Sequence, residues 1–573
     1  MTTGIASLRS QYPRHFLATE LDLGDWQAIQ PYFDKLDTLP VDTTQQLEQW
    51  ILQLSELSAA IGDESSRRYI AMTCNTEDPQ LEAAYLHYVQ EILPKCEPRF
   101  FELSKKYLAA PALPTLPEKR YQVYTRNRES EVTLYREENI PLQIEDETLS
   151  QQYQKICGEQ VATFQGTEHT IPQLARYLEE TDRNKRREAW QTATRRQLQD
   201  REKLEEIFDR MVQLRHQMAL NAGYPNFLEY QFQRLGRFDY TPADCETFHH
   251  AVETIIRPLR RQILEKRKKD LGLAALCPWD LQVDPQGRGP LRPFENTDEL
   301  IDGTSKIFSA IHPAFAQDFD ILKHNNLLDL ASRKGKAPGG YQSTLDEARL
   351  PFIFMNATGR NQDVFTLLHE GGHAFHALAF RNEPLHSYRN APIEFCEVAS
   401  MGMEMMATEK LEAIYSPEDA QRARLSHLED IIMLLPWIMR VDAFQHWIYK
   451  NPGHSRQERA AQWLALEQRF ADELDWSATE LSQYRECSWM TKLHFFCVPL
   501  YYIEYGIAQL GALQLWIQYL QNQEQAITRY RQALALGNSR PLPQLFEAAG
   551  LQFAFDPAMI QPLAEKLQQH LQN

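Results

Sequence analysis

Residues 369–373 read His-Glu-Gly-Gly-His, and this run most narrows what the chain can fold into. The apolar residues around it recur with the period of a helix, which predicts a helix over Asn361–Arg381. Two histidines four residues apart lie on one face of a helix, about a turn from each other. Both imidazoles can then bind a single Zn²⁺, while Glu370 between them stands beside the position that the protein leaves open on the metal. The run therefore predicts that His369 and His373 are zinc ligands.

Two consecutive glycines, Gly371 and Gly372, lie inside this predicted helix. Each glycine lowers the stability of a helix by about 1 kcal/mol relative to alanine. A bare backbone is useful where another group must approach closely. We therefore expect close packing against this stretch, because a purely structural helix rarely keeps two such losses side by side.

A catalytic zinc needs a third protein ligand. The metzincin arrangement is excluded, because it requires a glycine seven residues and a histidine ten residues after the first histidine, where this chain has His376 and Ala379. A carboxylate from a following helix is the other common solution. Pro392 marks the start of such a helix. Glu394 and Glu397 could both reach the metal from it, and their spacing alone does not choose between them.

Three further residues near the predicted ligands have expected roles. Glu404 lies two turns beyond Glu397 on the same helix face, so it could orient a ligand histidine from behind. His376 shares the face of His373, and we expect it to support the site or to pack rather than to bind metal. Glu370 is expected to be the general base on the attacking water and then the proton carrier to the leaving amine.

The clearest strand signal comes just before the predicted zinc helix. Residues 339–345 and 350–355 are short, rich in strand-forming residues and separated by a polar turn. Gly339 and Gly340, followed by Tyr341, leave the backbone of the first strand accessible. The pair is either a small structural hairpin or a free edge to which a bound peptide adds a strand.

A third chemically dense segment is residues 494–506. Tyr502 and Tyr505 are three residues apart, so a helix beginning near Pro499 would carry both on one side. Their hydroxyls, together with His494, could donate hydrogen bonds to an oxyanion that forms at the zinc. The residues alone favour the alternative reading, an aromatic stripe in the core.

Size and composition restrict the class of protein. A chain of 573 residues can bury a large core and should form two or more lobes or one large helical body. The formal net charge of −18 argues against a nucleic-acid partner. The eight cysteines are scattered, which suggests reduced thiols and an intracellular compartment. No signal peptide and no membrane-spanning run are visible, so we expect a cytoplasmic protein.

Taken together, these residues resemble the thimet oligopeptidase/oligoendopeptidase F family of zinc metallopeptidases. The resemblance begins near residue 215, and residues 1–200 share only a general helical character. The motifs that carry it are Asn221–Phe227, Gly339–Tyr341, Phe354–Asn356, Asp363–Phe365, His369–His376, Phe395–Ser400, His494–Tyr505, Leu536–Pro543 and Ala549-Gly550.

The resemblance implies a role for each candidate residue. Glu397 becomes the third zinc ligand, because it begins the E-x-x-S-x-x-x-E pattern that ends at Glu404. Tyr502 and Tyr505 become donors to the transition state, and His494 becomes a donor or a substrate contact.

The resemblance also implies the fold. It is a mainly α, helical ellipsoid with a small β-sheet beside the zinc helix and a deep channel with zinc at its floor. Such a channel admits short, unfolded peptides and excludes folded proteins. The segment Gly339–Tyr341 corresponds to the substrate-binding edge. We expect an N-terminal helical lobe over residues 1–200 and a catalytic region over residues 201–573.

The function predicted from the sequence is a cytoplasmic zinc endopeptidase acting on oligopeptides, with one Zn²⁺ per chain and neither nucleic-acid nor membrane partners. The nearest alternative is a zinc carboxypeptidase of similar helical architecture. An alternative from another class is a peptide-binding or scaffolding protein with a vestigial site.

Overall fold

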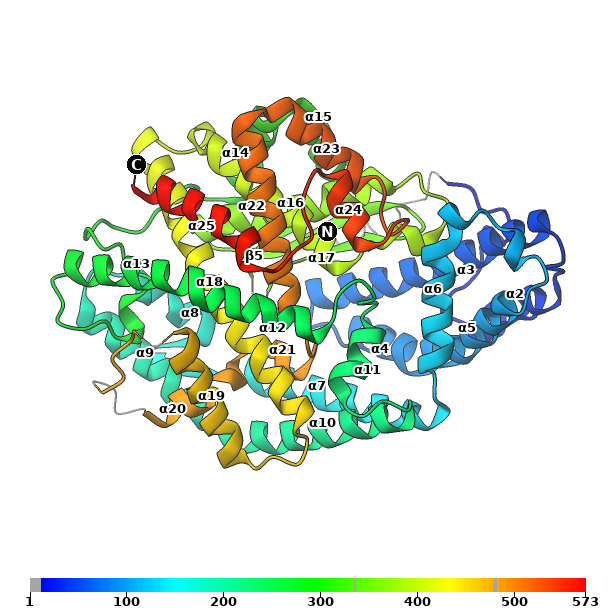
Figure 1. Ribbon diagram of the computed structural model, residues 1–573, viewed down its shortest axis with the longest axis horizontal. Coiled ribbons are helices and arrows are strands. Elements are labelled where there is room, and N and C mark those ends of the chain that lie inside the picture. Colours follow the sequence, from blue (N-terminus) through cyan, green and yellow to red (C-terminus); the bar gives the residue numbers. More distant parts are fainter. Residues whose placement is uncertain (1–11, 334–335, 338, 472, 478–481, 573) are drawn as a thin grey trace. The chain divides into compact units, whose positions relative to one another are not determined.

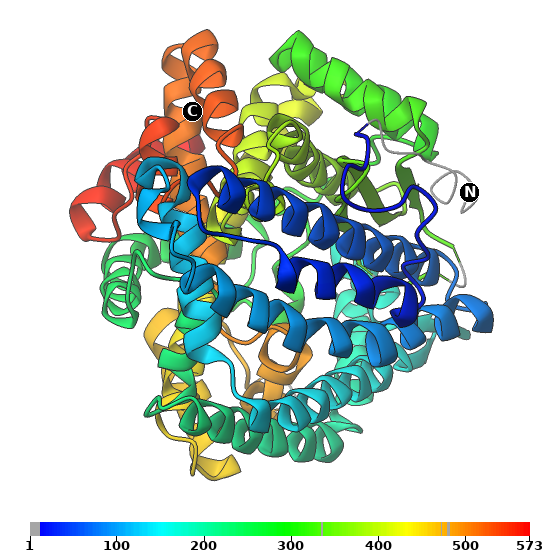
Figure 2. The same cartoon turned by 90° about the vertical axis from the view of Figure 1, so that its right-hand side faces the viewer.

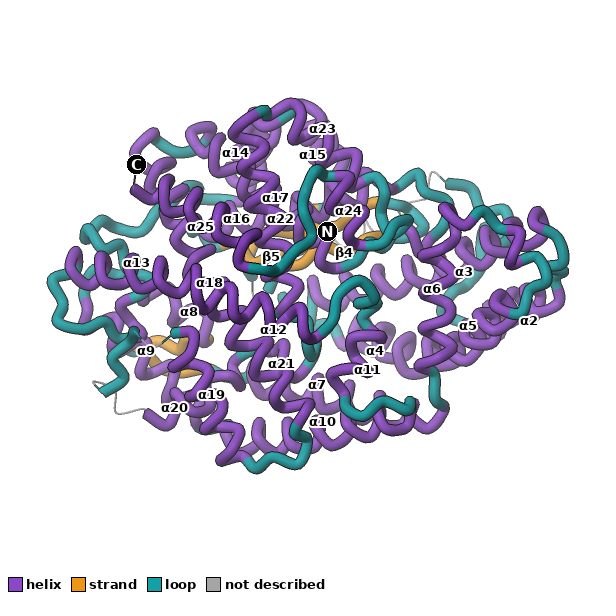
Figure 3. Tube along the Cα trace, viewed as in Figure 1, coloured by secondary structure: helices purple, strands orange, loops and turns teal. Residues whose placement is uncertain are grey.

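The computed structural model describes residues 12–333, 336–337, 339–471, 473–477 and 482–572. Contacts divide the chain into two compact units, each built from three separate segments: Met1–Tyr135, Arg292–Gln421 and Gly511–Phe553 in the first, and Arg136–Leu291, Arg422–Leu510 and Ala554–Asn573 in the second. Helices dominate and strands are few (Figure 3). The predicted mainly α fold is confirmed, whereas the division at residue 200 stays a prediction.

The first unit holds the predicted zinc helix. Its helices and strands, most of them labelled in Figure 1, are α2 (Trp26–Thr38), α3 (Thr44–Cys74), α4 (Pro79–His87), α5 (Leu93–Leu108), α6 (Glu118–Leu134), α14 (Thr297–Ile311), α15 (Pro313–His324), β3 (Leu328–Ala331), β4 (Tyr341–Leu345), β5 (Leu350–Ala357), α16 (Asn361–Phe380), α17 (Ile393–Ala407), α23 (Gln523–Leu534) and α24 (Leu542–Ala548).

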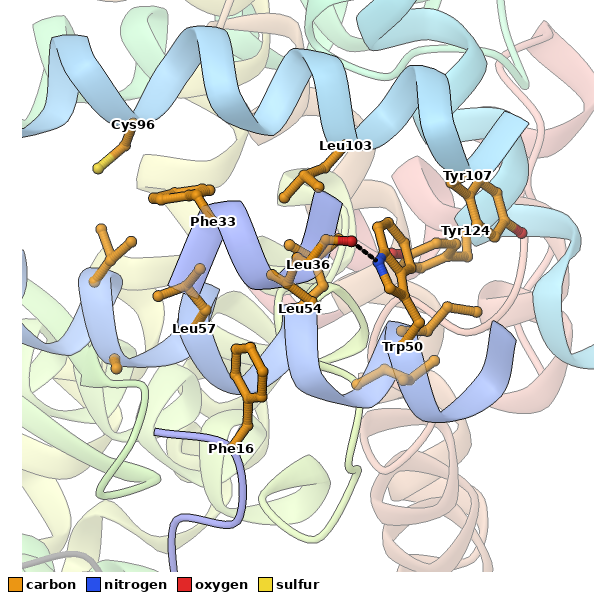
Figure 4. Close-up of a cluster of buried hydrophobic side chains, with 14 of the residues drawn as sticks. Phe16, Phe33, Leu36, Trp50, Leu54, Leu57, Cys96, Leu103, Tyr107 and Tyr124 are labelled. Atoms are coloured by element: carbon orange, nitrogen blue, oxygen red, sulfur yellow. Dashed lines mark hydrogen bonds between the residues drawn. The ribbon is translucent and has the colours of Figure 1, made fainter. Parts of the chain in front are cut away.

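The N-terminal helices of this unit share one apolar core. Figure 2 shows α2, α3 and α5 side by side. Phe33 and Leu36 of α2 face Trp50 of α3 and Leu103 of α5, and all four are buried (Figure 4). The Trp50 indole nitrogen donates to the Leu36 carbonyl at 2.9 Å, so this large side chain is buried with its one polar atom satisfied.

A three-stranded sheet leads into the zinc helix. Its order is β3-β5-β4, with β3 parallel and β4 antiparallel to the central strand. Both predicted strands are confirmed, and Pro351 lies at the start of its strand. Beyond β5, the Asp363 carboxylate accepts hydrogen bonds from the backbone N–H groups of Thr358 and Arg360 at 2.7 and 2.9 Å. These bonds satisfy amides at the turn into α16 and so fix where the helix begins.

The second unit is also mainly helical. Its elements are α7 (Ile140–Gly158), β1 (Val161–Phe164), β2 (Thr167–Thr170), α8 (Ile171–Ala175), α9 (Arg183–Leu198), α10 (Arg201–Asn221), α11 (Phe227–Arg234), α12 (Pro242–Ala251), α13 (Arg257–Asp270), α19 (Arg456–Phe470), α20 (Ser482–Cys487), α21 (Leu493–Phe496) and α25 (Pro557–Gln572). Two helices, α18 (Pro417–Lys450) and α22 (Ile503–Gln521), contain residues of both units. None of the helices in the described ranges is both long and apolar enough to cross a bilayer.

The helix predicted to begin near Pro499 begins later. The structure starts α22 at Ile503, which leaves Tyr502 in the turn before it. Leu500 has a φ of +66°, in the left-handed region that an α-helix of L-residues does not use. This conformation is held by a hydrogen bond from the Leu500 amide to the Gln445 side chain. The prediction was wrong by about one turn, because a side chain distant in sequence stabilises the turn.

Candidate metal centre and active site

Two helices of the first unit bring three potential metal ligands together. His369 and His373 lie on α16, and Glu397 lies in the second turn of α17. The Glu397 Oε2 atom is 3.4 Å from His369 Nε2 and 3.6 Å from His373 Nε2. Ligand atoms around one tetrahedral Zn²⁺ are separated by about 3.3–3.6 Å, given bonds of about 2.0–2.2 Å. The spacing therefore fits one zinc ion held by two imidazoles and one carboxylate.

The structure also distinguishes between the two acids that the sequence offers. Glu394 and Glu397 are both buried in α17. The set of side chains whose ligand atoms lie within 4.8 Å of one another contains His369, His373 and Glu397, and does not contain Glu394.

The two glycines of the run lie where other groups come very close. A Cβ atom on Gly372 would be 2.6 Å from the Ala399 carbonyl oxygen and from the Ser400 Cα atom, both backbone atoms of α17. A Cβ atom on Gly371 would be 2.6 Å from the ring of Phe308. The expected close packing is therefore present, and it lets α17 approach α16 at the level of the ligands.

Hydrogen bonds behind the candidate ligands orient them. His369 Nδ1 lies 2.7 Å from Glu404 Oε1, so the other nitrogen of the ring faces Glu397. The Ser400 hydroxyl donates to Glu397 Oε2 at 2.9 Å. Partners of this kind fix the ring and carboxylate orientations on which metal affinity depends.

The charges around the cluster favour a cation. Burial lowers the pKa of His373 to about 4, so this ring is neutral, as a metal ligand must be. Burial also acts to lower the pKa of His369, but hydrogen bonds to Glu397 and Glu404 outweigh it and raise that pKa well above the usual value. Two carboxylates that attract a proton to this ring attract a divalent cation to the same place. The donor set and its charge both fit zinc.

Glu370 has the properties of a general base. Its side chain is buried beside the cluster, and this burial raises the pKa of Glu370 to about 7. The nearby Glu397 and Glu404 carboxylates raise it further, whereas His369 and a hydrogen bond from the Gln342 backbone amide lower it. A base with a pKa near the working pH combines an ionised fraction with a strong affinity for the proton it removes.

The segment predicted to bind substrate leads into the edge strand. Among the described strands, β4 pairs with β5 alone. Gly339 has a φ of +97°, whereas a Cβ on Gly340 would make only ordinary contact with the Phe354 carbonyl, at 3.4 Å. Tyr341 stacks on the ring of Phe354, and its hydroxyl lies 2.6 Å from Thr73 Oγ1. These contacts anchor Tyr341 and hold β4 in place beside α16.

His376 packs against aromatic rings, and its Nε2 atom has no hydrogen-bond partner among the described residues. Its ring lies against those of Phe380 and Phe395, with centroids 5.1 and 6.0 Å away. Burial lowers the pKa of His376 to about 3, so the ring is neutral. The sequence suggested that His376 either supports the site or packs, and this environment matches packing.

The three aromatic candidates belong to the second unit, where they form one cluster. The His494 ring lies 4.7 Å from that of Tyr502 and 5.9 Å from that of Tyr505, centroid to centroid. The Trp437 indole nitrogen donates to the Tyr502 hydroxyl at 3.0 Å. A tyrosine that accepts this bond keeps its own proton available for donation.

Comparison with known proteins assigns the chain to a family. Residues 176–565 match the sequence profile of peptidase family M3, and residues 16–135 match the peptidase M3 N-terminal domain. The chain belongs to peptidase family M3. This membership confirms the predicted family and the enzyme class, an M3 metallopeptidase of the oligoendopeptidase F type.

Individual relatives of this M3 family member are distant. An oligoendopeptidase F homolog of Borreliella burgdorferi is 24% identical over 315 residues, which cover 53% of this chain and 52% of the relative. The chain thus spans about half the length of this curated relative. Two solved structures align almost end to end at 26% identity: PZ peptidase A with an inhibitor (TM-score 0.90, 99% of both chains) and a protein assigned as oligoendopeptidase F (TM-score 0.91, 99% and 98%).

The sequence did not predict three groups that contact the candidate zinc ligands or Glu370. The Ser400 hydroxyl was signalled by its place in the E-x-x-S-x-x-x-E pattern, three residues after Glu397 and so on the same helix face. The backbone of Cys396, which hydrogen-bonds the His373 ring, and the Gln342 amide beside Glu370 left no signal. Backbone groups carry no residue identity, so only the fold reveals them.

Proposed function

We propose that this chain is a zinc-dependent endopeptidase that hydrolyses internal bonds of short, unfolded oligopeptides. The observation that carries the proposal is Glu370, a buried carboxyl with a pKa of about 7 beside the three ligand side chains His369, His373 and Glu397. One catalytic Zn²⁺, held by those three residues, would lower the pKa of the attacking water and polarise the scissile carbonyl.

The chain's own residues then move the proton and stabilise charge. Glu370 accepts a proton from the attacking water and returns it to the leaving amine, so it ends each cycle ionised. Glu404 and Ser400 hold His369 and Glu397 in position throughout. Donors preorganised toward an oxyanion contribute about 2.7–4 kcal/mol each to transition-state stabilisation. Family resemblance assigns this task to Tyr502, Tyr505 and His494.

The edge strand supports a peptide as the substrate. Strand β4 has one partner among the described strands, so its other side is suited to pairing with an extended peptide through backbone hydrogen bonds. The Gln342 amide on this strand hydrogen-bonds Glu370, which links the proposed binding edge directly to the base. Gly339–Tyr341 lead into this edge. Extended, unfolded peptides fit such an edge, whereas folded proteins keep their backbone groups paired.

The expected location is the cytoplasm. All eight cysteines lie in the described part of the chain outside any disulfide, five of them buried and three half-buried. Reduced thiols are typical of an intracellular compartment. The net charge of −18 gives no support to a nucleic-acid partner.

A peptide blocked at both ends tests the proposal. An acetylated and amidated, internally quenched peptide library is incubated with the protein, with and without a chelator, and products are mapped by mass spectrometry. We expect cleavage at internal bonds that the chelator abolishes and zinc restores. The carboxypeptidase alternative would leave blocked peptides intact and trim unblocked ones. A protein that binds the peptides without any turnover in the presence of zinc would contradict the proposal.

A further inference from the structure

A second group of potential metal ligands lies in the second unit. Cys245 and His249 are four residues apart on α12, and Asp442 and His446 are four residues apart on α18. Two helices thus present two i, i+4 pairs to each other, the same spacing that joins the two histidines of α16. All four side chains are buried, and the ligand atoms of Cys245, Asp442 and His446 lie within 4.8 Å of one another.

Distances within this cluster fit a metal ion bound by three of its residues. Asp442 Oδ2 is 3.2 Å from His446 Nε2, close to the edge of a zinc tetrahedron, about 3.3 Å. Asp442 Oδ2 is also 2.8 Å from His249 Nε2, which is a hydrogen-bond distance. His249 therefore orients the Asp442 carboxylate in the way that Glu404 orients His369.

Polar atoms of the cluster are buried without hydrogen bonds. Among the described residues, neither ring nitrogen of His446 has a hydrogen-bond partner, and Asp442 Oδ1 has none either. Each such group destabilises the folded protein when nothing satisfies it. The His446 and Asp442 side chains are almost fully enclosed, so the protein interior must supply the compensation. A cation bound by His446 Nε2 and by the Asp442 carboxylate supplies it for these two groups.

The charges balance once a divalent ion is included. A Cys245 thiolate and the Asp442 carboxylate together carry two negative charges. Two ion pairs act on the cluster from nearby, the buried pair of Arg237 with Glu504 and the more exposed pair of Lys450 with Glu246, both at 2.8 Å, and each is neutral as a pair. A buried site with no net charge avoids most of the cost of enclosing its ions.

We propose that Cys245, Asp442 and His446 bind a second divalent metal ion of the zinc class, with His249 as the residue that positions Asp442. Thiolate and imidazole ligands select zinc over magnesium or calcium, which take oxygen ligands. The aromatic rings of Phe232 and Phe470 lie beside the two imidazoles, at 6.2 and 6.4 Å between centroids, and keep the site away from bulk water. The ion ties α12 to α18 and stabilises the second unit.

Metal content of the full chain tests this proposal without measuring activity. The tag-free protein, purified under reducing conditions, is analysed for zinc by plasma mass spectrometry. We expect two equivalents in the wild type and one in His373→Ala, which loses the ion at α16. We expect one equivalent in Cys245→Ala and none in the double variant. Cys487→Ala removes another buried thiol of the second unit and should keep two equivalents.

Cobalt reports the second site separately, because the candidate ligands on α16 and α17 include no cysteine. Protein reconstituted with Co²⁺ should show thiolate-to-cobalt charge-transfer absorption, retained in His373→Ala and lost in Cys245→Ala and in His446→Gln. The wild-type spectrum decides the question even where a variant fails to fold. One zinc equivalent in the wild type with no charge-transfer band overturns the proposal. A second equivalent that survives in both Cys245→Ala and His446→Gln, folded by circular dichroism, also overturns it.

Discussion

Replacing Gly372 by alanine should separate the two helices that hold the ligands. The added Cβ would lie 2.6 Å from two backbone atoms of α17, the Ala399 oxygen and the Ser400 Cα. Ordinary contact begins at 3.4 Å, so α17 must move away by about 0.8 Å. Glu397 lies between the moved atoms and the start of α17, and it moves with them.

The expected effects differ for stability and for activity. Alanine gains about 1 kcal/mol of helix propensity over glycine, while overpacking costs about 1–3 kcal/mol. The net loss of stability is therefore about 0–2 kcal/mol, and the variant should fold. A displacement of about 1 Å at a reacting site can cost about 10²-fold in rate. We expect Gly372→Ala to lose about 100-fold in kcat/KM and to bind zinc more weakly, while its melting temperature falls by a few degrees.

Gly402→Ala, on the helix α17 that Gly372 contacts, is the matched control. Its Cβ would meet the end of the Leu515 side chain at 2.7 Å, and a side-chain terminus can rotate away where a backbone cannot. Its kcat/KM and zinc affinity should stay within about threefold of the wild type, which corresponds to about 0.6 kcal/mol. If Gly372→Ala retained wild-type zinc affinity and turnover, the close approach of α16 and α17 would not position the ligands.

Three further predictions concern single groups. Glu404→Gln removes the carboxylate behind His369, so zinc affinity measured by chelator competition should fall about 10–100-fold, and an unchanged affinity would count against the orienting role. The kcat/KM should decline as the pH falls below 7, because Glu370 must be ionised to act, its pKa is about 7, and a bound cation lowers that pKa further; a rate that stays flat to pH 4 would exclude Glu370 as the base. Tyr502→Phe should lose about 10²–10³-fold in kcat with its zinc retained, whereas Tyr501→Phe should change little, and equal effects of the two would argue against an oxyanion donor.

Local patterns predicted the elements around the site well. The helix over Asn361–Arg381 is present to within one residue, and the glycine pair was correctly interpreted as a point of close approach. Helical period and strand alternation depend on residues near in sequence, which is why they can be read directly. The identity of the approaching group, the backbone of α17, depends on the packing of two helices and was not readable.

Contacts between distant segments account for what the sequence missed. Spacing left Glu394 and Glu397 equivalent, and only the packing of α17 on α16 brings Glu397 to the histidines. The start of α22 was misplaced because Gln445, distant in sequence, stabilises the turn at Leu500. The cluster around Asp442 was overlooked, because its ligands come from helices almost 200 residues apart and match no continuous motif.

Glu370→Gln tests the central claim most directly, because it removes the base and leaves the ligands intact. Glutamine has nearly the same shape but cannot accept the proton of the attacking water. We predict that the purified variant contains as much zinc as the wild type and cleaves a blocked, quenched peptide about 10²–10⁴-fold more slowly. Near-normal cleavage by the zinc-loaded variant would contradict the account.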